Sequence, residues 1–429
     1  MTAAASPIDR ERFRAALKPL LAGPDLALGV SGGSDSLGLV LLAAEAREAL
    51  DLQLHALTVD HGLRAESGAE AARVGEICAG LDIPHTVLTW RGEKPASNLQ
   101  AAARDARYAL MRAWRRAHDV RTLAVAHTQD DLAETFLMRL ARGSGVDGLS
   151  AMAPLREEGG GLRLIRPLLS VTRADLQAVC RARGVAWIED PSNEDPRFDR
   201  VRARQALAAL APLGLDRERL AKTARHMRRA RTALEGATEA LLADATLEED
   251  REIGWRRLRI APLHAAPEEL GLRAFAAVLR ATAGADYPPR FDTLEAAFEA
   301  LQAPVGGRTL HGCLLDWSEG LLTFCREPAA VAPPARLTRE SETVWDGRWS
   351  VAAAEEGLTV GALGEAGLAA LRQLQDEAVI TAPGNWRRAP RAARLSAPGL
   401  WRGDALFAAP AAGLRGEAAT ISPLWEAAG

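Results

Sequence analysis

The sequence has 429 residues, of which 48% are hydrophobic and 25% charged, and it carries a formal net charge of −3. These values predict a globular protein of two to four domains, and the net charge alone does not indicate a nucleic-acid-binding protein. The four cysteines are scattered without a CxxC pair, which argues against a zinc ribbon or a disulfide framework and is typical of a reducing compartment such as the cytoplasm. No run of 18 apolar residues would span a membrane, and the N-terminal stretch lacks the apolar core of a signal peptide.

The first 210 residues alternate strand-like and helix-like patterns. Short apolar runs predict strands at residues 26–30, 54–59, 85–90 and 122–126. Helical patterns predict helices at residues 37–50, 70–81, 98–117 and 130–141, the third with Asn98 as its N-cap. This alternation predicts an α/β fold with a doubly wound parallel sheet, whose ligands bind at the carboxyl ends of the strands. Three loops follow predicted strands, and we expect them to meet at one edge of the sheet: residues 31–36, 60–64 and 127–131.

The rest of the chain divides into two further parts. Residues 211–330 have a mainly helical pattern, and residues 328–336 contain three prolines, which is typical of a linker. Residues 331–429 have short segments broken by Gly and Pro, and they predict a small mixed α/β domain. We therefore expect three domains, at residues 1–210, 211–330 and 331–429.

The first loop has the composition of a phosphate-binding loop, and its sequence is Ser31-Gly32-Gly33-Ser34-Asp35-Ser36. The glycines let the backbone approach a ligand closely, the serines add hydroxyl donors, and the free N–H groups of the following helix attract an anion. The Gly-Lys-Ser/Thr ending of a Walker loop is missing. We predict that this loop binds nucleotide phosphates, with Asp35 reaching them through Mg²⁺. An ordinary glycine-rich turn with a helix cap is the alternative.

Three ionisable side chains follow the fourth predicted strand. His127, Asp131 and Glu134 are spaced i, i+4 and i+7, so a helix would place all three on one face. That face would hold Mg²⁺ through the carboxylates, together with Asp35, while His127 meets the phosphates or the reacting base. The alternative is structural, with Thr128 as the helix N-cap, Asp131 as its partner and Glu134 in solvent.

Four further residues near the predicted sheet edge are candidates for ligand binding. Arg104 and Arg107 are three residues apart on one predicted helix, so they share a face that would contact ATP phosphates or an RNA backbone. Asp60 and His61 follow the second predicted strand, where they would help to seat a metal ion or the ribose of ATP. A solvated helix face and a strand-end turn are the respective alternatives.

The charge is distributed unevenly along the chain. Residues 197–231 contain eleven Arg or Lys and three acidic residues, whereas residues 232–334 contain nine basic and sixteen acidic residues. Arg200, Arg202 and Arg204 alternate within the basic segment. We predict that these three arginines contact RNA phosphates, with an exposed helix face as the alternative.

Several motifs follow one another in order between residues 25 and 205. Besides the first loop they are Val59-Asp60-His61-Gly62-Leu63-Arg64, Asn98-Leu99, Ala103-Arg104, Ala106-Arg107-Tyr108, Ala126-His127-Thr128-Gln129-Asp130-Asp131-Leu132-Ala133-Glu134-Thr135, Arg142-Gly143-Ser144-Gly145, Gly148-Leu149, Arg166-Pro167-Leu168-Leu169, and Asp190-Pro191-Ser192-Asn193 with Asp195, Phe198 and Arg200. As an ordered set they resemble the tRNA(Ile)-lysidine synthetases, which belong to the N-type ATP pyrophosphatase (PP-loop) superfamily. The family often has Asn where this chain has Val201, so any role of that Asn side chain is absent or moved here.

The resemblance implies a ligase that uses ATP and Mg²⁺. Such an enzyme would adenylate O2 of the wobble cytidine in the isoleucine tRNA with a CAU anticodon, and the ε-amine of free lysine would displace AMP from C2 to give lysidine. The later regions of the chain would help to bind the tRNA. The ATP site would be the first loop with Asp60 and His61, and the expected catalytic residues are Asp35, Arg107, His127, Asp131 and Glu134.

Two other readings of the sequence stay open. Another PP-loop enzyme, such as a tRNA thiolase, would need a reactive cysteine pair or an iron–sulfur site, and the four cysteines lack that spacing. A non-catalytic RNA-binding relative would have no need of an intact phosphate loop with Asp131 and Glu134. The sequence does not fix the oligomeric state, for which a homodimer is one open alternative.

Overall fold

The computed structural model describes residues 8, 10–63, 67–92, 94–95, 99–158, 161–189, 197, 199–339, 342–416 and 419–424. The chain divides into two compact units, Met1–Thr232 and Ala233–Gly429. The domain boundaries expected at residues 210 and 330 stay predictions.

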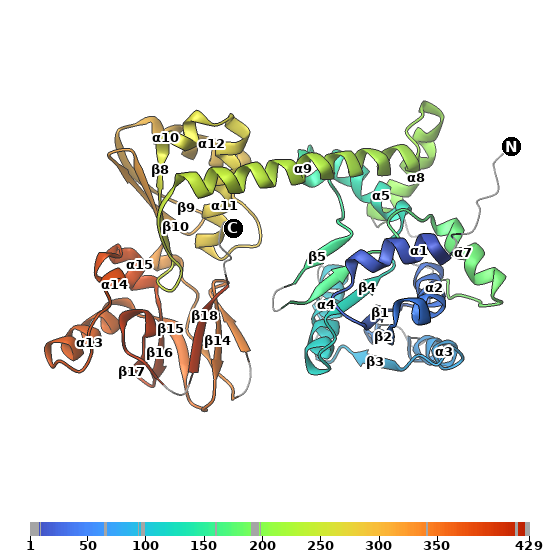
Figure 1. Ribbon diagram of the computed structural model, residues 1–429, viewed down its shortest axis with the longest axis horizontal. Helices are drawn as coiled ribbons and strands as arrows, with labels where there is room; N and C mark the ends of the chain where they lie inside the picture. The colour runs from blue at the N-terminus through green and yellow to red at the C-terminus, as the bar shows by residue number, and fades with distance from the viewer. Residues whose placement is uncertain are drawn as a thin grey trace. The chain divides into compact units, whose positions relative to one another are not determined.

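The first unit is built around a six-stranded sheet in the order β3-β2-β1-β4-β6-β5 (Figure 1). Its strands are β1 (Asp25–Gly29), β2 (Gln53–Asp60), β3 (His85–Thr89), β4 (Thr122–Val125), β5 (Leu155–Glu157) and β6 (Arg163–Ile165). All neighbouring strands pair in parallel except β5 and β6, which are antiparallel. The expected parallel sheet is confirmed, and β5 and β6 extend it with strands of three residues each, too short to leave a distinct apolar run.

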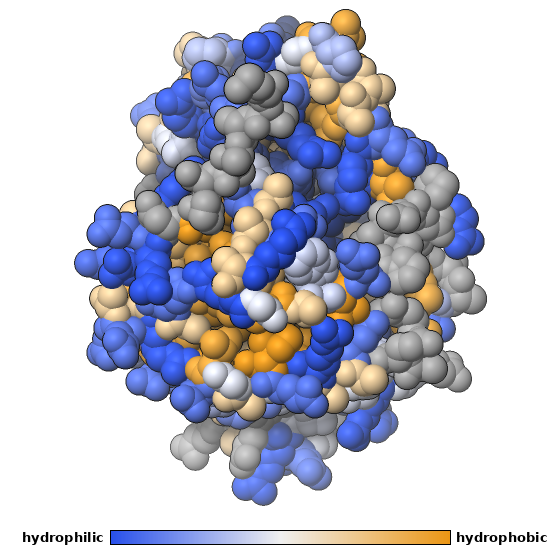
Figure 2. Space-filling model, turned by 90° about the vertical axis from the view of Figure 1, so that its right-hand side faces the viewer, coloured by the Kyte–Doolittle hydropathy of each residue, from blue (hydrophilic) through white to orange (hydrophobic). Residues whose placement is uncertain are grey.

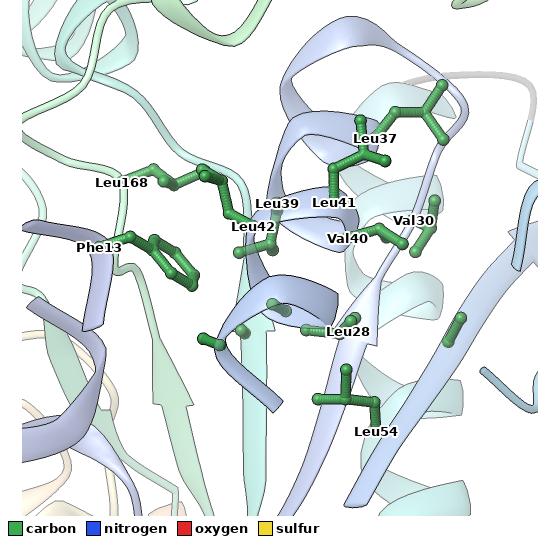
Figure 3. Packing of buried hydrophobic residues seen from close by; sticks show 14 of the residues in the cluster. Phe13, Leu28, Val30, Leu37, Leu39, Val40, Leu41, Leu42, Leu54 and Leu168 are labelled. Atoms are coloured by element: carbon green, nitrogen blue, oxygen red, sulfur yellow. The ribbon is translucent and has the colours of Figure 1, made fainter. Parts of the chain in front are cut away.

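Helices cover both faces of this sheet, as expected for a doubly wound fold. They are α1 (Arg10–Leu17), α2 (Ser34–Leu50), α3 (Ser67–Ala79), α4 (Leu99–Ala117), α5 (Gln129–Leu140), α6 (Val146–Leu149), α7 (Arg173–Ala182) and α8 (Asp199–Leu210), with short 3-10 turns η1 (Lys18–Leu20) and η3 (Ala211–Leu213). Leu26 and Leu28 of β1 join a core cluster with Phe13 of α1 and residues of α2, α3 and α7 (Figure 3). Ala27, between them, faces the other side and joins a cluster with Met111 of α4.

The start of α2 differs from the sequence prediction. The helix begins at Ser34 and not at residue 37, because Gly33 adopts an extended backbone conformation (φ −74°, ψ 163°) and serves as the N-cap. Ser34, Asp35 and Ser36 therefore form the first turn of a helix. Their backbone N–H groups lie among the unpaired donors that every helix N-terminus carries.

The second unit contains three antiparallel sheets, in the orders β7-β8-β11-β10-β9, β12-β15-β16-β17 and β13-β14-β18. The strands are β7 (Thr246–Asp250), β8 (Trp255–Arg259), β9 (Val305–Leu310), β10 (Cys313–Ser318), β11 (Leu321–Arg326), β12 (Ala335–Arg336), β13 (Glu342–Trp345), β14 (Trp349–Ala353), β15 (Thr359–Ala362), β16 (Pro398–Arg402), β17 (Ala405–Ala408) and β18 (Ala419–Pro423). The helices from the end of the first unit onward are α9 (Arg217–Ala245), α10 (Ile260–Ala265), α11 (Glu268–Ala283), α12 (Phe291–Glu299), α13 (Gly364–Asp376), α14 (Gly384–Arg388) and α15 (Arg391–Ser396), with the turns η4 (Ala300–Gln302), η5 (Pro328–Ala330) and η6 (Pro410–Ala412). The expected helical region thus contains α9 to α12 and, in addition, a five-stranded sheet. A mixed α/β region follows it, as expected.

The helices of the described ranges differ in length and in apolar character. Among these residues, no helix combines the length and the apolar character needed to cross a bilayer. On the face drawn in Figure 2, hydrophilic residues predominate and apolar residues form smaller patches among them.

Candidate active site

The predicted phosphate loop lies between β1 and α2, at the carboxyl edge of the first sheet. Because β1 pairs in parallel with β2 on one side and β4 on the other, the loops after all three strands open at the same edge. Gly32 has a φ of +84°, and a Cβ atom there would lie 2.5 Å from Cδ1 of Ile188. The backbone conformation therefore favours glycine at this position, and a larger residue would also have to displace the end of the Ile188 side chain.

Hydrogen bonds within the loop fix its shape. The hydroxyl of Ser36 donates to the carbonyl oxygen of Gly33 at 3.0 Å and accepts from the N–H of Ser31 at 3.1 Å. The hydroxyl of Ser34 donates to Oδ1 of Asp35 at 3.3 Å. Ser36 thus holds the loop together, while the first N–H groups of α2 are available to an anion.

Three helices begin beside this loop. Helix α2 begins at Ser34, α5 at Gln129 and α7 at Arg173. The backbone N–H of Arg173 donates to Oδ2 of Asp130 in the first turn of α5, at 2.9 Å, and so joins the two helix starts. The partial positive charges of three N-termini therefore act on one region, which favours the binding of a polyanion such as a triphosphate.

Arg173 bridges two of the predicted site carboxylates. Its Nε donates to Oδ2 of Asp35 at 2.9 Å, and its Nη2 lies 3.8 Å from Oδ1 of Asp131. Burial raises the pKa of Asp35, and the Arg173 guanidinium offsets part of this effect. Arg173 was not among the residues predicted from the sequence, where the Thr172–Asp175 capping box around it indicates only the start of a helix.

Asp131 caps helix α5 with one carboxylate oxygen and directs the other toward arginines. Its Oδ2 accepts hydrogen bonds from the N–H and the hydroxyl of Thr128, at 2.8 and 2.9 Å, and so forms the capping box of α5. Its Oδ1 faces cations instead, with Arg173 at 3.8 Å and Nη1 of Arg200 at 4.0 Å. Burial acts to raise the pKa of Asp131, but the neighbouring His127, the Thr128 hydrogen bond and the two guanidinium groups together hold it below its usual range.

His127 lies just before α5 and is held by Arg166. The Nε of Arg166 donates to Nδ1 of His127 at 3.2 Å, and its Nη1 donates to the carbonyl oxygen of Ala153 at 2.9 Å. Burial lowers the pKa of His127 to about 3. A neutral imidazole that accepts at Nδ1 carries its proton on Nε2, so His127 has an N–H donor available for a phosphate oxygen.

Glu134 lies on the same helix and is buried, with 1% of its surface exposed, so the solvated alternative is wrong. Its Oε1 accepts from Nε of Arg204 at 2.9 Å. Its Oε2 is buried and has no hydrogen-bond partner among the described residues. Burial raises the pKa of Glu134, against the opposing effect of Arg204.

The arginines of α8 do not share one face. Arg200 and Arg204, one helical turn apart, both approach the carboxylates of α5. Arg202 lies on a different face, where it pairs with exposed Asp199 and keeps 62% of its side chain exposed. The alternating pattern suggested that Arg200, Arg202 and Arg204 act together. Because a helix has 3.6 residues per turn, however, residues two positions apart lie on different faces. Contact of these arginines with RNA stays a prediction.

Asp60 shapes the loop that follows β2. Its Oδ1 accepts from the N–H of Gly62 and from the hydroxyl of Ser67, both at 2.8 Å. These two hydrogen bonds hold the pKa of Asp60 below its usual range. The contacts are those of a strand-end turn, and a role of Asp60 in ATP binding stays a prediction.

Basic and aromatic side chains gather between the end of β2 and α4. Nη2 of Arg107 lies 3.4 Å from Nε2 of His61, and the His61 ring meets Trp90 edge-on with centroids 5.9 Å apart. The guanidinium of Arg104 lies 5.2 Å from the centre of the Tyr108 ring. Such a mixture of charge and rings suits contact with nucleotides or single-stranded RNA.

The carboxylates of the loop edge fit a magnesium ion. No group of three or more His, Cys, Asp or Glu side chains is arranged to hold a metal within the part of the chain that the structure describes. Mg²⁺ needs only one or two protein carboxylates, however, when substrate phosphates supply the other oxygens. Asp35 and Asp131, which share one guanidinium, meet this need, and Glu134 adds a buried oxygen without a hydrogen bond. The set Asp35, Asp131 and Glu134 stays a prediction.

Part of the motif set falls outside the described residues. This applies to Arg64, Asn98, Asp190, Pro191, Ser192, Asn193, Asp195 and Phe198. The expected N-cap at Asn98 therefore stays a prediction.

Comparison with known proteins identifies the family of this chain. Residues 6–211 match the PP-loop domain family. The chain is 42% identical over 398 residues to the tRNA(Ile)-lysidine synthase of Ruegeria pomeroyi, covering 91% of this chain and 89% of that protein. It is 41% identical over 339 residues to the enzyme of the same name from Methylobacterium nodulans, covering 76% of this chain and 98% of that protein. A solved U34-tRNA thiolase from Methanococcus maripaludis is similar at 17% identity with a TM-score of 0.44, covering 52% of this chain and 77% of that chain. This chain belongs to the tRNA(Ile)-lysidine synthase family.

Proposed function

We propose that this chain is a tRNA-modifying ligase. It joins the ε-amine of lysine to C2 of the wobble cytidine in the isoleucine tRNA with a CAU anticodon, and it converts ATP to AMP and pyrophosphate. The chain belongs to this family, and one observation carries the proposal. The N-termini of three helices lie near one another, and Arg173 there bridges Asp35 and Asp131. That arrangement supplies both an anion site and carboxylates for Mg²⁺ at one edge of the sheet.

The first half-reaction transfers the adenylyl group. O2 of the cytidine attacks the α-phosphorus of ATP, and the bond to the β-phosphate oxygen breaks to release pyrophosphate. The N–H groups at the start of α2 and the Nε2–H of His127 are the groups that stabilise the charge on the phosphates. Asp35 and Asp131 would hold Mg²⁺, which neutralises phosphate charge when bound.

The second half-reaction forms the new carbon–nitrogen bond. The neutral ε-amine of lysine attacks C2, the C2–O2 bond breaks, AMP leaves, and the amine loses a proton. The reacting base must first leave its stack. The surface of Arg104, Arg107, His61 and Trp90 suits this requirement, because it offers both rings for stacking and positive charge for the RNA backbone.

The cysteines weigh against a thiolase. All four are free and buried, and burial raises the pKa of Cys78 and Cys180 to about 11 and that of Cys313 and Cys325 to about 12. Sulfur transfer and iron–sulfur ligation both need thiolates. Free, unpaired cysteines also fit the cytoplasm, which we infer as the place of action.

The test is mass spectrometry of the anticodon after incubation of CAU isoleucine tRNA with the enzyme, ATP and Mg²⁺. Parallel reactions contain lysine, glutamine, ammonium or a sulfur donor, and a tRNA with another anticodon serves as the control. We expect one cytidine to gain the mass of lysine minus water in the lysine reaction alone. A gain of sulfur, or modification only outside the anticodon, would refute the proposal.

A further inference from the structure

Helices α2 and α7 pack against each other, and two ion pairs link α2 to the start of α7 and to Arg183, which directly follows α7. Asp35 pairs with Arg173 at the start of the two helices, and Glu45 pairs with Arg183, each ten residues later in the sequence. The two pairs are also alike in exposure, since the side chains are 20% and 28% exposed in the first pair and 17% and 30% in the second. The Glu45–Arg183 pair therefore serves as the structural reference for the Asp35–Arg173 pair.

The two pairs differ in their surroundings. Glu45 is shared by two arginines, because Nε of Arg10 also lies 3.0 Å from it. At the phosphate-loop end the ratio is reversed, and the one guanidinium of Arg173 is shared by Asp35 and Asp131. Nη1 of Arg200 also lies 4.0 Å from Oδ1 of Asp131, so Asp131 faces two guanidinium groups at similar distances. At the loop end one guanidinium thus bridges two carboxylates, whereas at the outer end one carboxylate bridges two guanidinium groups.

Arg173 lies between the two carboxylates that a divalent cation would also use. A guanidinium and Mg²⁺ cannot both occupy the space between the same carboxylate oxygens. A guanidinium is equally suited to a phosphate, because its fork of N–H donors matches phosphate oxygens as well as it matches carboxylates. The start of α7 lies beside the predicted phosphate loop, so a short side-chain rotation exchanges one partner for the other.

We propose that Arg173 competes with Mg²⁺ for Asp35 and Asp131, and that it binds a phosphate of ATP once Mg²⁺ has displaced it. This inference rests on the proposed function, because it takes these carboxylates as the metal ligands. The exchange keeps every charged group paired. The two carboxylates would bind the metal ion in place of the arginine, and the arginine would bind the phosphate. It also couples the two ligands, because Mg²⁺ alone must displace Arg173 without the compensating contact that ATP provides.

The test compares Arg173→Gln with the matched control Arg183→Gln. The dissociation constant for Mg²⁺ alone is measured by calorimetry and by thermal shift at constant ionic strength, and that for ATP in the presence of Mg²⁺ is measured separately. We expect Arg173→Gln to bind Mg²⁺ alone about three- to tenfold more tightly than wild type, because its competitor is gone. We expect it to bind ATP about tenfold or more weakly, because a charged hydrogen bond to phosphate is lost. Arg183→Gln should change neither constant.

Further variants separate the outcomes. Adding Asp35→Asn to Arg173→Gln should abolish the gain in Mg²⁺ affinity. Arg173→Lys keeps the charge without the fork, so it should leave Mg²⁺ affinity near the wild-type value and still weaken ATP binding. If Arg173→Gln matches Arg183→Gln in both titrations, or if Arg173→Lys binds ATP normally, the inference is wrong. Formation of lysidine by the wild-type enzyme would then still uphold the proposed function.

Discussion

The molecule contains two clusters of arginines and carboxylates that differ in how completely the carboxylate oxygens are hydrogen-bonded. In the second unit, the side chain of Asp346 is 1% exposed and accepts four hydrogen bonds between 2.7 and 3.1 Å, from Arg326, Arg348 and the N–H of Ala332. At the phosphate loop, by contrast, Asp131 meets its arginines at 3.8 and 4.0 Å, and one oxygen of Glu134 has no hydrogen bond among the described residues.

This difference separates a structural cluster from a binding site. A carboxylate with short bonds on both oxygens has no capacity left for a ligand, and its main effect is on stability. A cluster with long contacts and an unsatisfied oxygen keeps that capacity, at some cost in stability. The two clusters should therefore respond to mutation in opposite ways, one in stability and the other in activity.

The largest effect is expected for Asp35→Asn. This change removes a proposed metal ligand, and we expect pyrophosphate release with tRNA and lysine to fall about 10³-fold or more, equivalent to roughly 4 kcal/mol in the barrier. The free energy of unfolding should change by no more than about 1 kcal/mol, because the lost ion pair is partly exposed. Glu45→Gln, on the same helix, is the control for both measurements. Normal turnover of Asp35→Asn would remove it from the site.

Asp346→Asn should show the reverse pattern. Asp346 has a φ of +52°, a conformation that Asn tolerates, so the substitution removes charge without new backbone strain. It leaves the guanidinium groups of Arg326 and Arg348 buried without their partner, and we expect a loss of about 3 kcal/mol in the free energy of unfolding, measured in urea. Glu355→Gln, which breaks the exposed pair with Arg402, should cost less than about 1 kcal/mol. Equal effects of the two changes would contradict the distinction.

The sequence predicted the parallel sheet and the phosphate loop because both depend on local patterns. Apolar runs revealed β1 to β4, and the serine–glycine loop follows directly from one of them. Arg173 escaped prediction because it meets Asp35 only through the fold, across 138 residues of sequence.

The directions of the α8 arginines could not be predicted from their spacing in the sequence. Their alternation in sequence suggested one RNA-binding group, whereas the helix sends Arg200 and Arg204 toward α5 and Arg202 elsewhere. Asp131 shows a different limit. The sequence offered a cap and a metal ligand as alternatives, but the two carboxylate oxygens serve separate partners.

A moderate effect is expected for Arg166→Met at the edge of the loop cluster. Loss of its hydrogen bond frees Nδ1 of His127, so the imidazole is no longer held with its proton on Nε2. We expect kcat for AMP formation to fall about tenfold to a hundredfold, as for the loss of a charged hydrogen bond. The control is Arg112→Met on α4, which disturbs the ion pair of Arg112 with Glu158 and should leave kcat near the wild-type value. A similar loss in both variants would indicate a general disturbance of the fold.

The smallest effect is expected for Arg202→Gln, which tests the surface beside the cluster. Arg202 is the member of the α8 trio that is turned away from the carboxylates, and its pair with Asp199 is exposed, so it is free to exchange that partner for an RNA phosphate. We expect tRNA binding to weaken slightly and the slope of log K against log salt to become shallower by about one unit, as for the loss of one phosphate contact. Because Arg202 does not touch the loop cluster, ATP affinity should stay unchanged, whereas Arg204→Gln should disturb Glu134 and lower activity as well. An unchanged salt slope in Arg202→Gln would show that this face of α8 does not contact the tRNA. The contacts of Arg200 and Arg204 with the carboxylates of α5 would then be the remaining role of the three arginines.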